Sequence, residues 1–453
     1  MLRVMDAAGP EDQHTLRRHV VRTLALAWPM VLSRIGIVLM FSIDVVVLGR
    51  AGAEGLADYV LGLSINESLV GMTIGLMIGV PILVARAAGA GEDAAAGRIW
   101  RRGLGFGIAV GLVLALALQA AETIFIASGQ DPELAARAAR VTRIVAFSLP
   151  CIAAYNVSAA LLEALHRPGA ALVAIMIANV VRAGLNVTLV FGLGPIPPLG
   201  AIGCAIGGTL VFFGLAVGMS IYVWRFFPER ARYGIETPGM APPFATQVRL
   251  GLATGASFLF EAGAFTVVTL LAGRLGVLAL AAHGVVFQFL ALTFMLALGI
   301  AGATQVRVSN AWGRGDPHGM AMAGWTGLLL ATLLVGAATL VYASFPATAI
   351  GVFTDDAAVV AAAVPVMLWM ALATVFDGGQ AVMNNACRGR GDVWFPAALH
   401  FGSYWLVLVP LAWALAFPLG QGLAGVYQAI LIASVVALAL LAARFRRLSR
   451  AEP

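Results

Sequence analysis

Long apolar segments alternate with short polar ones along almost the whole chain. Because a helix rises about 1.5 Å per residue, about 20 apolar residues are enough to cross the roughly 30 Å of hydrocarbon in a bilayer. The pattern therefore predicts an all-α integral membrane protein with twelve transmembrane helices. These spans cover residues 21–48, 57–86, 103–121, 138–165, 170–194, 199–225, 247–273, 277–308, 322–343, 358–387, 395–417 and 423–444.

The apolar pattern is broken most clearly near the middle of the chain, by FPERARYGIETPGMAPP. This polar, proline-bearing stretch leaves six spans on either side of it. We therefore expect two six-helix lobes joined by a linker. The expected parts are a cytoplasmic N-terminal segment (1–20), an N-terminal lobe (21–225), a cytoplasmic linker (226–246), a C-terminal lobe (247–445) and a cytoplasmic tail (446–453).

Short similarities relate the two halves. LGRAGAEGLA (48–57) matches AGRLGVLALA (272–281), and this alignment pairs Arg50 with Arg274. Shared glycine and alanine content can produce part of such a match. Six spans per half place both repeats in the membrane with the same orientation, so the predicted relation is a parallel repeat about a pseudo-two-fold axis along the membrane normal. A central cleft between the lobes is the expected substrate route.

Composition agrees with a membrane protein, since 61% of the residues are hydrophobic and only 11% are charged. The net charge is +6, and all 28 basic residues are arginines. Most of them fall in segments that share one side of the membrane if the N-terminus is cytoplasmic. This asymmetry favours membrane topology over nucleic-acid binding, and it predicts a multi-pass protein with both termini in the cytoplasm. The high alanine, glycine and arginine content fits a G+C-rich bacterial genome, so the expected location is the bacterial inner membrane.

Three single carboxylates, Asp44, Glu261 and Asp377, lie inside apolar runs. An ionisable side chain at membrane depth costs about 2.5 to 3.5 kcal/mol, so it normally marks an ion or substrate pathway. Burial disfavours the charged form of a carboxylate and a nearby cation favours it, so such a group can alternate between protonated and cation-paired states. The sequence therefore predicts an ion-coupled transporter. Interhelical hydrogen bonding is the alternative reading for Glu261 and Asp377.

The sequence gives little support for ATP hydrolysis or for enzyme activity. A chain without lysine cannot form the G-x-x-x-x-G-K-[ST] loop of ATP hydrolysis. Neither HExxH nor a serine, histidine and acid constellation is evident, so we expect no enzyme activity and no resident cofactor. A passive channel or a membrane scaffold would not need three acids within its spans.

The chain resembles the multidrug and toxic compound extrusion (MATE) family, NorM branch, from about residue 20 to 445. This resemblance implies a two-lobed antiporter that exports amphipathic, often cationic organic compounds in exchange for H⁺ or Na⁺. A lipid-linked precursor flippase of the same superfamily is the alternative, although such a protein would be expected to place basic residues in its cleft. The segments that carry the resemblance are AWPMVLSRIGIVLMFSIDVVVLGRAG (27–52), FLFEAGAFTVVTLLAGRLG (258–276), LALAAHGVVFQF (278–289), QVRVSNAWGRGD (305–316) and FDGGQAVMNNACRGRGD (376–392).

NorM-type members carry acids in spans one, seven and ten, and these positions match Asp44, Glu261 and Asp377 here. The resemblance implies that Glu261 and Asp377 bind the proton, or Na⁺, in the C-terminal lobe. Glu261 lies about 16 Å along its span by helical rise, near the midplane. Asp377 precedes Gly378 and Gly379, where we expect a locally weakened helix whose backbone carbonyls could become ligands.

The N-terminal lobe departs from the family pattern. Members commonly pair the span-one acid with asparagines in span five, and this chain has Asn186 with Arg182 one helical turn earlier. A buried arginine stays charged and pairs with a carboxylate or with carbonyls. We hypothesise that Arg182 pairs with Asp44 and replaces a coupling cation there; alternatively, Arg182 faces elsewhere and Asp44 titrates normally. Asn179 and Thr209 are assigned to the same network.

Four further residues are weaker candidates. Glu163 matches an acid often found late in span four of the family, and Glu67 is an acid where the family predicts none; a structural role is equally compatible with each. Pro29 and Pro365 remove backbone hydrogen bonds within spans one and ten, so they are candidate hinges or merely tolerated prolines. The expected partners are amphipathic drugs or toxins and the lipid bilayer, with no nucleic acid, and we expect a monomer.

Overall fold

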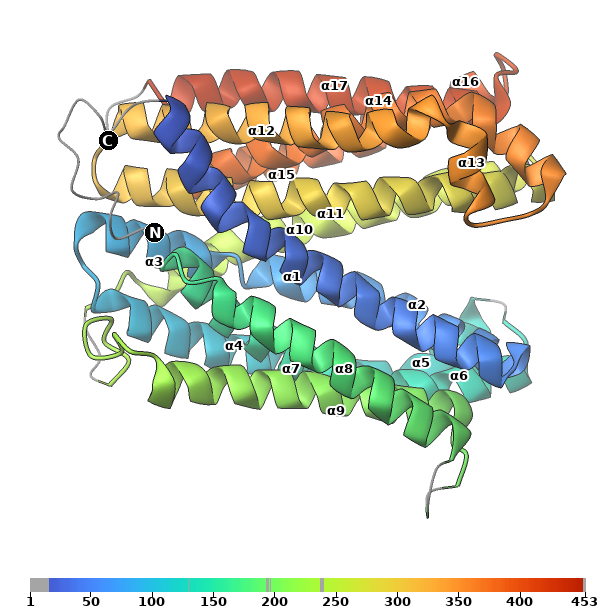
Figure 1. Cartoon of the computed structure of the whole chain (residues 1–453), viewed down its shortest axis with the longest axis horizontal. Helices are drawn as coiled ribbons and strands as arrows, with labels where there is room; N and C mark the ends of the chain where they lie inside the picture. Colours follow the sequence, from blue (N-terminus) through green and yellow to red (C-terminus); the bar gives the residue numbers. More distant parts are fainter. Residues whose placement is uncertain (1–15, 129, 193–194, 196, 237–239, 451–453) are drawn as a thin grey trace. The chain divides into compact units, whose positions relative to one another are not determined.

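Long helices joined by short turns make up the chain in a computed structural model (Figure 1). The structure describes residues 16–128, 130–192, 195, 197–236 and 240–450. Within these ranges there is no strand, and twelve helices are long and apolar enough to cross a membrane. The predicted all-α membrane fold with twelve spans is confirmed. The spans are Leu16–Ala51, Glu54–Ala90, Ala95–Ala127, Pro132–Ala164, Gly169–Phe191, Gly200–Phe226, Phe244–Arg274, Val277–Gly313, Pro317–Ser344, Ala357–Arg390, Trp394–Ala416 and Gly422–Leu448.

The helices form two compact units whose boundaries fall inside helices α1 and α10. One unit, called the N unit here, runs from Ile35 to Phe258. The other, the C unit, joins the residues up to Arg34 with those from Leu259 onward. The sequence analysis instead predicted that the boundary between the two lobes lies at the linker between spans six and seven. Each of the helices α1 and α10 thus contributes to both units.

The N unit holds most of the first half of the chain. Its elements are α1 (Leu16–Ala51) from Ile35 on, α2 (Ala53–Leu76), α3 (Gly79–Ala90), α4 (Ala95–Ala117), the 3-10 turn η3 (Leu118–Ala120), α5 (Ala121–Ala127), α6 (Pro132–Val145), α7 (Ser148–Ala164), α8 (Gly169–Phe191), α9 (Gly200–Ile221), the π-helical turn η4 (Tyr222–Phe226) and α10 (Phe244–Arg274) as far as Phe258.

The C unit holds the remaining helices together with the beginning of α1. Its elements are α1 up to Arg34, α10 from Leu259, α11 (Val277–Gly313), α12 (Pro317–Ser344), α13 (Pro346–Gly351), α14 (Ala357–Arg390), α15 (Trp394–Phe401), the π-helical segment η5 (Gly402–Leu408), α16 (Val409–Ala416) and α17 (Gly422–Leu448).

Glycines allow close packing of the two helices, α1 and α10, that contribute to both units. In the N unit, a Cβ added to Gly251 of α10 would lie 2.0 Å from the carbonyl oxygen of Leu76. In the C unit, a Cβ on Gly299 of α11 would lie 2.3 Å from a methyl carbon of Val31 on α1. Lipid tails are as apolar as leucine, so close packing at small residues, rather than hydrophobicity, selects helix partners in a membrane.

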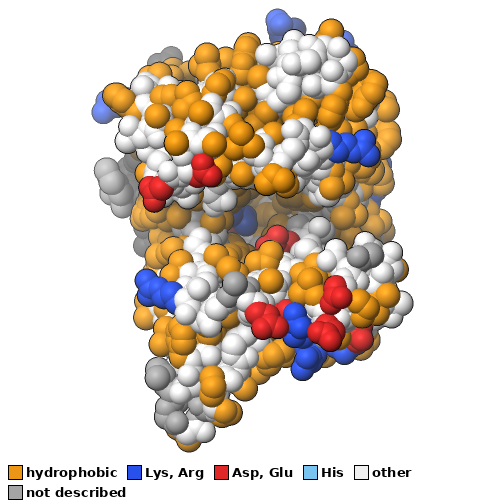
Figure 2. Space-filling view, turned by 90° about the vertical axis from the view of Figure 1, so that its right-hand side faces the viewer, with side chains coloured by type: hydrophobic (Ala, Val, Ile, Leu, Met, Phe, Trp, Pro, Cys, Tyr) orange, Lys and Arg blue, Asp and Glu red, His pale blue; other side chains and the backbone are white. Residues whose placement is uncertain are grey.

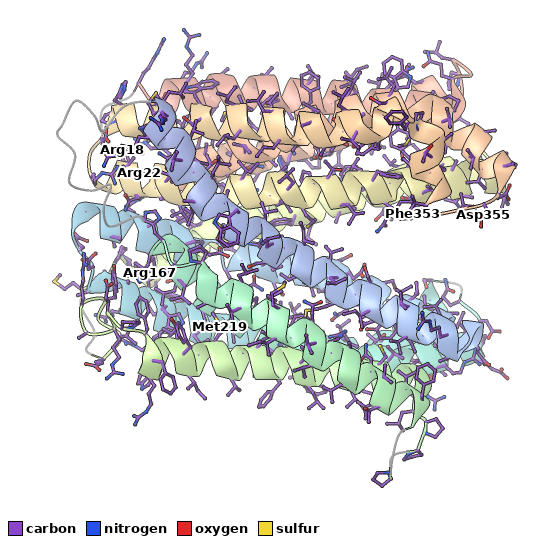
Figure 3. The ribbon with its side chains drawn as sticks, viewed as in Figure 1. Arg18, Arg22, Arg167, Met219, Phe353 and Asp355 are labelled. Atoms are coloured by element: carbon purple, nitrogen blue, oxygen red, sulfur yellow. The ribbon has the colours of Figure 1, made fainter. Side chains whose placement is uncertain are left out.

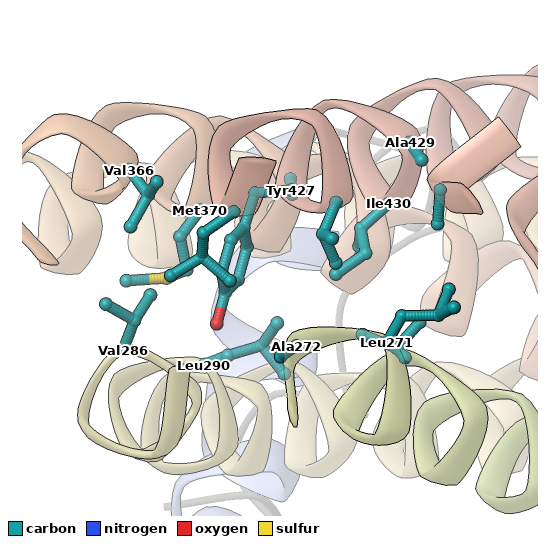
Figure 4. Packing of buried hydrophobic residues seen from close by; sticks show 14 of the residues in the cluster. Leu271, Ala272, Val286, Leu290, Val366, Met370, Tyr427, Ala429 and Ile430 are labelled. Atoms are coloured by element: carbon teal, nitrogen blue, oxygen red, sulfur yellow. The ribbon is translucent and has the colours of Figure 1, made fainter. Parts of the chain in front are cut away.

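Each unit has its own apolar core. A cluster of buried side chains in the C unit includes Val286, Leu290, Met370 and Tyr427 (Figure 4). A cluster around Leu48 lies in the N unit. Large apolar side chains also remain exposed over the described surface, as hydrophobic atoms on the face in Figure 2 illustrate. Exposed apolar helix faces are what a bilayer solvent requires.

The segment between the sixth and seventh spans is ordered against the N unit where it is described. Arg101 of α4 donates to the carbonyl oxygen of Ile235 at 2.7 Å, and Arg232 pairs with Asp93 at 2.7 Å. Arg167, labelled in Figure 3, pairs with Glu229. Residues 237–239 of the predicted linker lie outside the described residues. The described part of this linker is therefore a folded cap on the N unit.

Candidate ion-coupling sites

Asp44, on the part of α1 that belongs to the N unit, is fully buried and accepts four hydrogen bonds from three residues. Arg182 Nε donates to Oδ1 at 2.8 Å, and its Nη2 donates to Oδ2. Asn186 Nδ2 donates to Oδ1 at 2.7 Å, and the Tyr59 hydroxyl donates to Oδ2 at 2.6 Å. The predicted pairing of Arg182 with Asp44 is confirmed, and the alternative that Arg182 faces elsewhere is wrong.

The sequence around this ion pair leaves room for it. Arg182 and Asn186 lie one turn apart on α8, so both reach the same carboxylate. A Cβ on Gly208 of α9 would lie 2.6 Å from Arg182 Nη2, and one on Gly207 would lie 2.9 Å from Asn186 Oδ1. The guanidinium also lies 5.9 Å from the ring centre of Phe212 on α9. Two adjacent glycines on α9 therefore form the surface that receives the guanidinium and the amide.

Asn179 and Thr209, which were assigned to the same network, form no hydrogen bond with Asp44 itself. Asn179 Nδ2 donates to the carbonyl oxygens of Gly36 and Ile175, at 3.0 and 2.9 Å. The Thr209 hydroxyl donates to the carbonyl oxygen of Ala205 at 2.9 Å. Each side chain bonds to a carbonyl of its own helix, as short polar side chains commonly do, and Asn179 also joins α8 to α1.

A small cavity adjoins the ion pair. Its volume is about 10 Å³, and its lining includes Arg182, Asn66 and Thr209. The Nη1 atom of Arg182 and the Oδ1 atom of Asn66 are buried without a hydrogen-bond partner among the described residues. A polar cavity of this size holds about one water molecule. Water can thus complete the hydrogen bonding of the guanidinium without reaching the Asp44 carboxylate, whose own donors are in place.

Asp377, on α14 in the C unit, is 1% exposed and has a different environment. Its Oδ1 accepts hydrogen bonds from Gln380 Nε2 at 3.2 Å, from the Tyr404 hydroxyl at 3.3 Å and from the Ser434 hydroxyl at 3.3 Å. Its Oδ2 has no hydrogen-bond partner among the described residues. All three donors are neutral. A charged Asp377 would therefore lack the cationic partner that Asp44 has. Either a proton on the carboxylate or a bound cation can compensate this charge.

Glu261, on α10, lies in the same unit as Asp377, and its side chain keeps 19% of its surface exposed. Its Oε2 lies 3.9 Å from Nδ1 of the buried His400. Glu261 is thus the more accessible of the two acids.

Polar side chains connect the two acids through the C unit. His400 Nε2 lies 3.2 Å from Gln380 Oε1 and is also in contact with Asn384 Nδ2. Gln380 in turn donates to the Asp377 carboxylate and to the Tyr404 hydroxyl. The series Glu261, His400, Gln380, Asp377 therefore spans α10, α15 and α14. Helix α17 adds Ser434 to the same group.

Several of these residues could not be singled out from the sequence. Tyr404, Gln380, His400 and Ser434 are polar residues in apolar spans, but many such residues bond only to their own helix. Arg388 is not among the predicted site residues, and the structure shows it 4% exposed near the end of α14. Since a buried cation needs a compensating group, its burial is a signal that only the fold reveals.

The glycines after Asp377 do not interrupt their helix, contrary to expectation. Helix α14 continues through Gly378 and Gly379. A Cβ on Gly378 would lie 3.1 Å from Ala297, and one on Gly379 would lie 3.1 Å from Leu438. These glycines allow α11 and α17 to approach α14. Side chains, rather than freed carbonyls, thus surround Asp377.

The remaining candidates are two acids and two prolines, and the structure places each of them on a helix. Glu67 is exposed on α2 and Glu163 is half-buried near the end of α7. Pro29 and Pro365 lie inside the helices α1 and α14, which continue through them. A hinge at either proline stays a prediction, because a single structure contains one conformation.

Comparisons with known proteins cover nearly the whole chain. The MatE family model matches residues 29–188 and 253–414, one stretch in each half. A probable multidrug resistance protein NorM from Caulobacter vibrioides is 36% identical, over 98% of this chain and 96% of the relative. One from Mesorhizobium japonicum is 32% identical, over 99% and 98%. The solved structure of the eukaryotic MATE transporter AtDTX14 shares the fold with a TM-score of 0.86 at 19% identity, covering 96% of this chain and 98% of that one.

Proposed function

The chain belongs to the MatE family, and on this premise we propose that it is a secondary active multidrug exporter that exchanges amphipathic, often cationic organic compounds for H⁺ or Na⁺. The names of its relatives support export of drugs over flipping of a lipid-linked precursor. We place the protein in the bacterial inner membrane with both termini in the cytoplasm, because its arginines are distributed asymmetrically.

The contrast between Asp44 and Asp377 carries the proposal for where coupling occurs. Asp44 already has a permanent cation, the Arg182 guanidinium. Asp377 has neutral donors on one oxygen and an unpartnered second oxygen among the described residues. A carboxylate can exchange a proton or a cation only when no fixed charge occupies that position. Exchange is therefore assigned to Asp377 and Glu261.

The same residues fit either coupling ion. Carboxylate, hydroxyl and amide oxygens are suitable ligands for hard cations such as Na⁺, and Asp377, Tyr404, Ser434 and Gln380 supply them. For a proton, Glu261 is the entry point because its side chain is partly exposed, whereas Asp377 is buried. His400 and Gln380 lie between the two acids. We propose that the proton arrives at Glu261 first and is then transferred towards Asp377.

Efflux from proteoliposomes tests this function. The purified chain is reconstituted with a fluorescent organic cation inside, and a pH gradient and a Na⁺ gradient are imposed separately. We expect one gradient to drive efflux, and we expect Glu261→Gln and Asp377→Asn each to abolish it. The matched control is Glu122→Gln, because Glu122 pairs with Arg143 outside the site. Full efflux in the double variant E261Q/D377N would contradict the coupling assignment, and no efflux from the unaltered chain under either gradient would contradict the exporter.

A further inference from the structure

The C unit contains a cavity that is separate from the coupling residues. It has a volume of about 430 Å³ and lies between the first turns of α12 and the end of α17. Both elements end there at the membrane–water boundary expected from the spans. The cavity is lined by Pro317, His318, Ala321, Trp325, Arg446, Ser449 and Arg450. No acidic residue is among these described lining residues.

Two arginines give the cavity a positive charge. Arg446, in the last turn of α17, and Arg450, two residues beyond the end of that helix, both line the cavity. Neither forms an ion pair with a described residue. The carboxylate of Asp316, at the start of α12, instead accepts a hydrogen bond from Gly319 N at 2.7 Å and lies 3.7 Å from Arg314. Among the described residues, therefore, no ion pair compensates the positive charge of the cavity.

Two neutral side chains complete the polar lining. His318 adds an imidazole, and Ser449 adds a hydroxyl that donates to the carbonyl oxygen of Arg446 at 3.2 Å. The N-terminal end of α12 is capped by Asp316, so the two arginines are the groups that can bind an anion here. Guanidinium groups match the oxygen geometry of phosphate through paired hydrogen bonds. The polar half of the cavity thus favours a phosphate group.

The cavity continues into an exposed apolar stripe. Trp325 is 38% exposed at its edge, and Leu329 and Leu333 follow at one-turn intervals along α12 with 43% and 58% exposure. The ring of Trp325 packs edge-on against Phe445 with centroids 6.1 Å apart, which fixes its position. Tryptophan commonly lies at the headgroup level of a bilayer. The stripe would hold an acyl chain directly below a bound headgroup.

We propose that this cavity binds an anionic phospholipid, with the phosphate at Arg446 and Arg450 and an acyl chain along Trp325, Leu329 and Leu333. Basic pockets between transmembrane helices are suited to lipid headgroups. A free phosphate ion would use only the polar half of the cavity and would leave the apolar stripe uncovered. The combination of paired charges with a continuous apolar stripe is the reason for choosing a lipid.

Quenching of tryptophan fluorescence by lipids with brominated acyl chains tests the proposal. The detergent-purified full chain is titrated with brominated phosphatidylglycerol or brominated phosphatidylcholine, and the quenching that disappears in Trp325→Phe is assigned to this site. Each arginine near the headgroups contributes about fivefold, so we expect about 30-fold tighter binding of phosphatidylglycerol. Arg446→Gln and Arg450→Gln should each remove about fivefold, and the double variant should remove the preference.

Matched controls separate the cavity from general surface charge. Arg447→Gln removes the same charge from the same helix end, but Arg447 does not line the cavity, so the preference should persist. Ala321→Phe fills the cavity without changing its charge and should weaken the binding of phosphatidylglycerol. Equal binding of the two lipids by the unaltered chain would overturn the proposal, as would an equal loss of preference in R447Q and R446Q.

Inorganic phosphate and glycerophosphate distinguish a lipid from a soluble phosphate. Each is added up to millimolar concentration against bound phosphatidylglycerol. If the lipid is the ligand, these ions displace it only weakly because they gain nothing from the apolar stripe. Displacement at the same concentration as short-chain phosphatidylglycerol would assign the site to free phosphate and overturn the lipid proposal. A melting curve for each variant establishes that it remains folded.

Discussion

Arg182 binds Asp44 through two hydrogen bonds in the buried interior of the N unit. The pair is 3% and 0% exposed at its two side chains, so its charges are shielded from water. Removing one partner of a buried pair leaves an uncompensated charge and typically costs about 3 to 5 kcal/mol. The carboxylate of Asp44 is therefore paired with a cation that cannot leave.

Replacing the fixed cation should convert Asp44 into an exchanging site. In Arg182→Asn, Asp44 keeps Asn186 and Tyr59 as donors but has no permanent counter-charge. We expect transport by this variant to gain a dependence on Na⁺ or H⁺ that the double variant D44N/R182N lacks. The measurement is the number of coupling ions exchanged per substrate in proteoliposomes. An unchanged stoichiometry in R182N would count against the role assigned to Arg182.

The guanidinium should also be replaceable by a free ion. Arg182→Ala leaves a space of guanidinium shape beside Gly208 and an unpaired Asp44. We expect the melting temperature to fall markedly, consistent with a cost of about 3 to 5 kcal/mol, and to recover partly when low millimolar guanidinium is added. Urea, which has a similar shape and no charge, is the control. Equal recovery with urea would show that charge compensation is not the reason for the recovery of the melting temperature.

The close approach of α9 should make Gly208 sensitive to substitution. A Cβ at this position would lie 2.6 Å from Arg182 Nη2 and 2.8 Å from its Cζ. Gly208→Ala should therefore displace the guanidinium and cost about 1 to 3 kcal/mol of stability. Gly214→Ala is the control on the same helix, because a Cβ there meets nothing within 4 Å. Thermal unfolding in detergent compares the two; similar melting temperatures would argue against the predicted clash.

The donors around Asp377 should set the pH range of transport. Tyr404→Phe removes a hydroxyl that lies 3.3 Å from Asp377 Oδ1. A hydrogen bond to a charged group contributes about 1.5 to 3 kcal/mol, and it stabilises the deprotonated carboxylate. If H⁺ is the coupling ion, its loss should move half-maximal efflux to higher pH. Tyr427→Phe is the control, since Tyr427 bonds to His283 elsewhere in the same unit. A profile that moves equally in both variants would contradict this assignment.

The sequence by itself determined the spans and the presence of three acids within them. A bilayer selects helices by the length and polarity of each local segment, so the twelve spans follow from the residues within them. The pairing of Arg182 with Asp44 was also accessible, because an arginine at membrane depth has few acceptable partners. The pairing of these two residues could therefore be predicted without knowledge of how the helices pack.

Only the tertiary structure decided which neutral side chains surround each acid. Tyr59, Tyr404 and Ser434 donate to carboxylates on other helices, whereas Thr209 and Asn179 bond to backbone carbonyls instead. Hydrophobic periodicity gives each helix a polarity but does not identify its neighbours. The neighbours depend on close approach at small residues distant in the chain, such as Gly299 against Val31. The division of α1 and α10 between the two units follows from the same packing, and no local pattern encodes it.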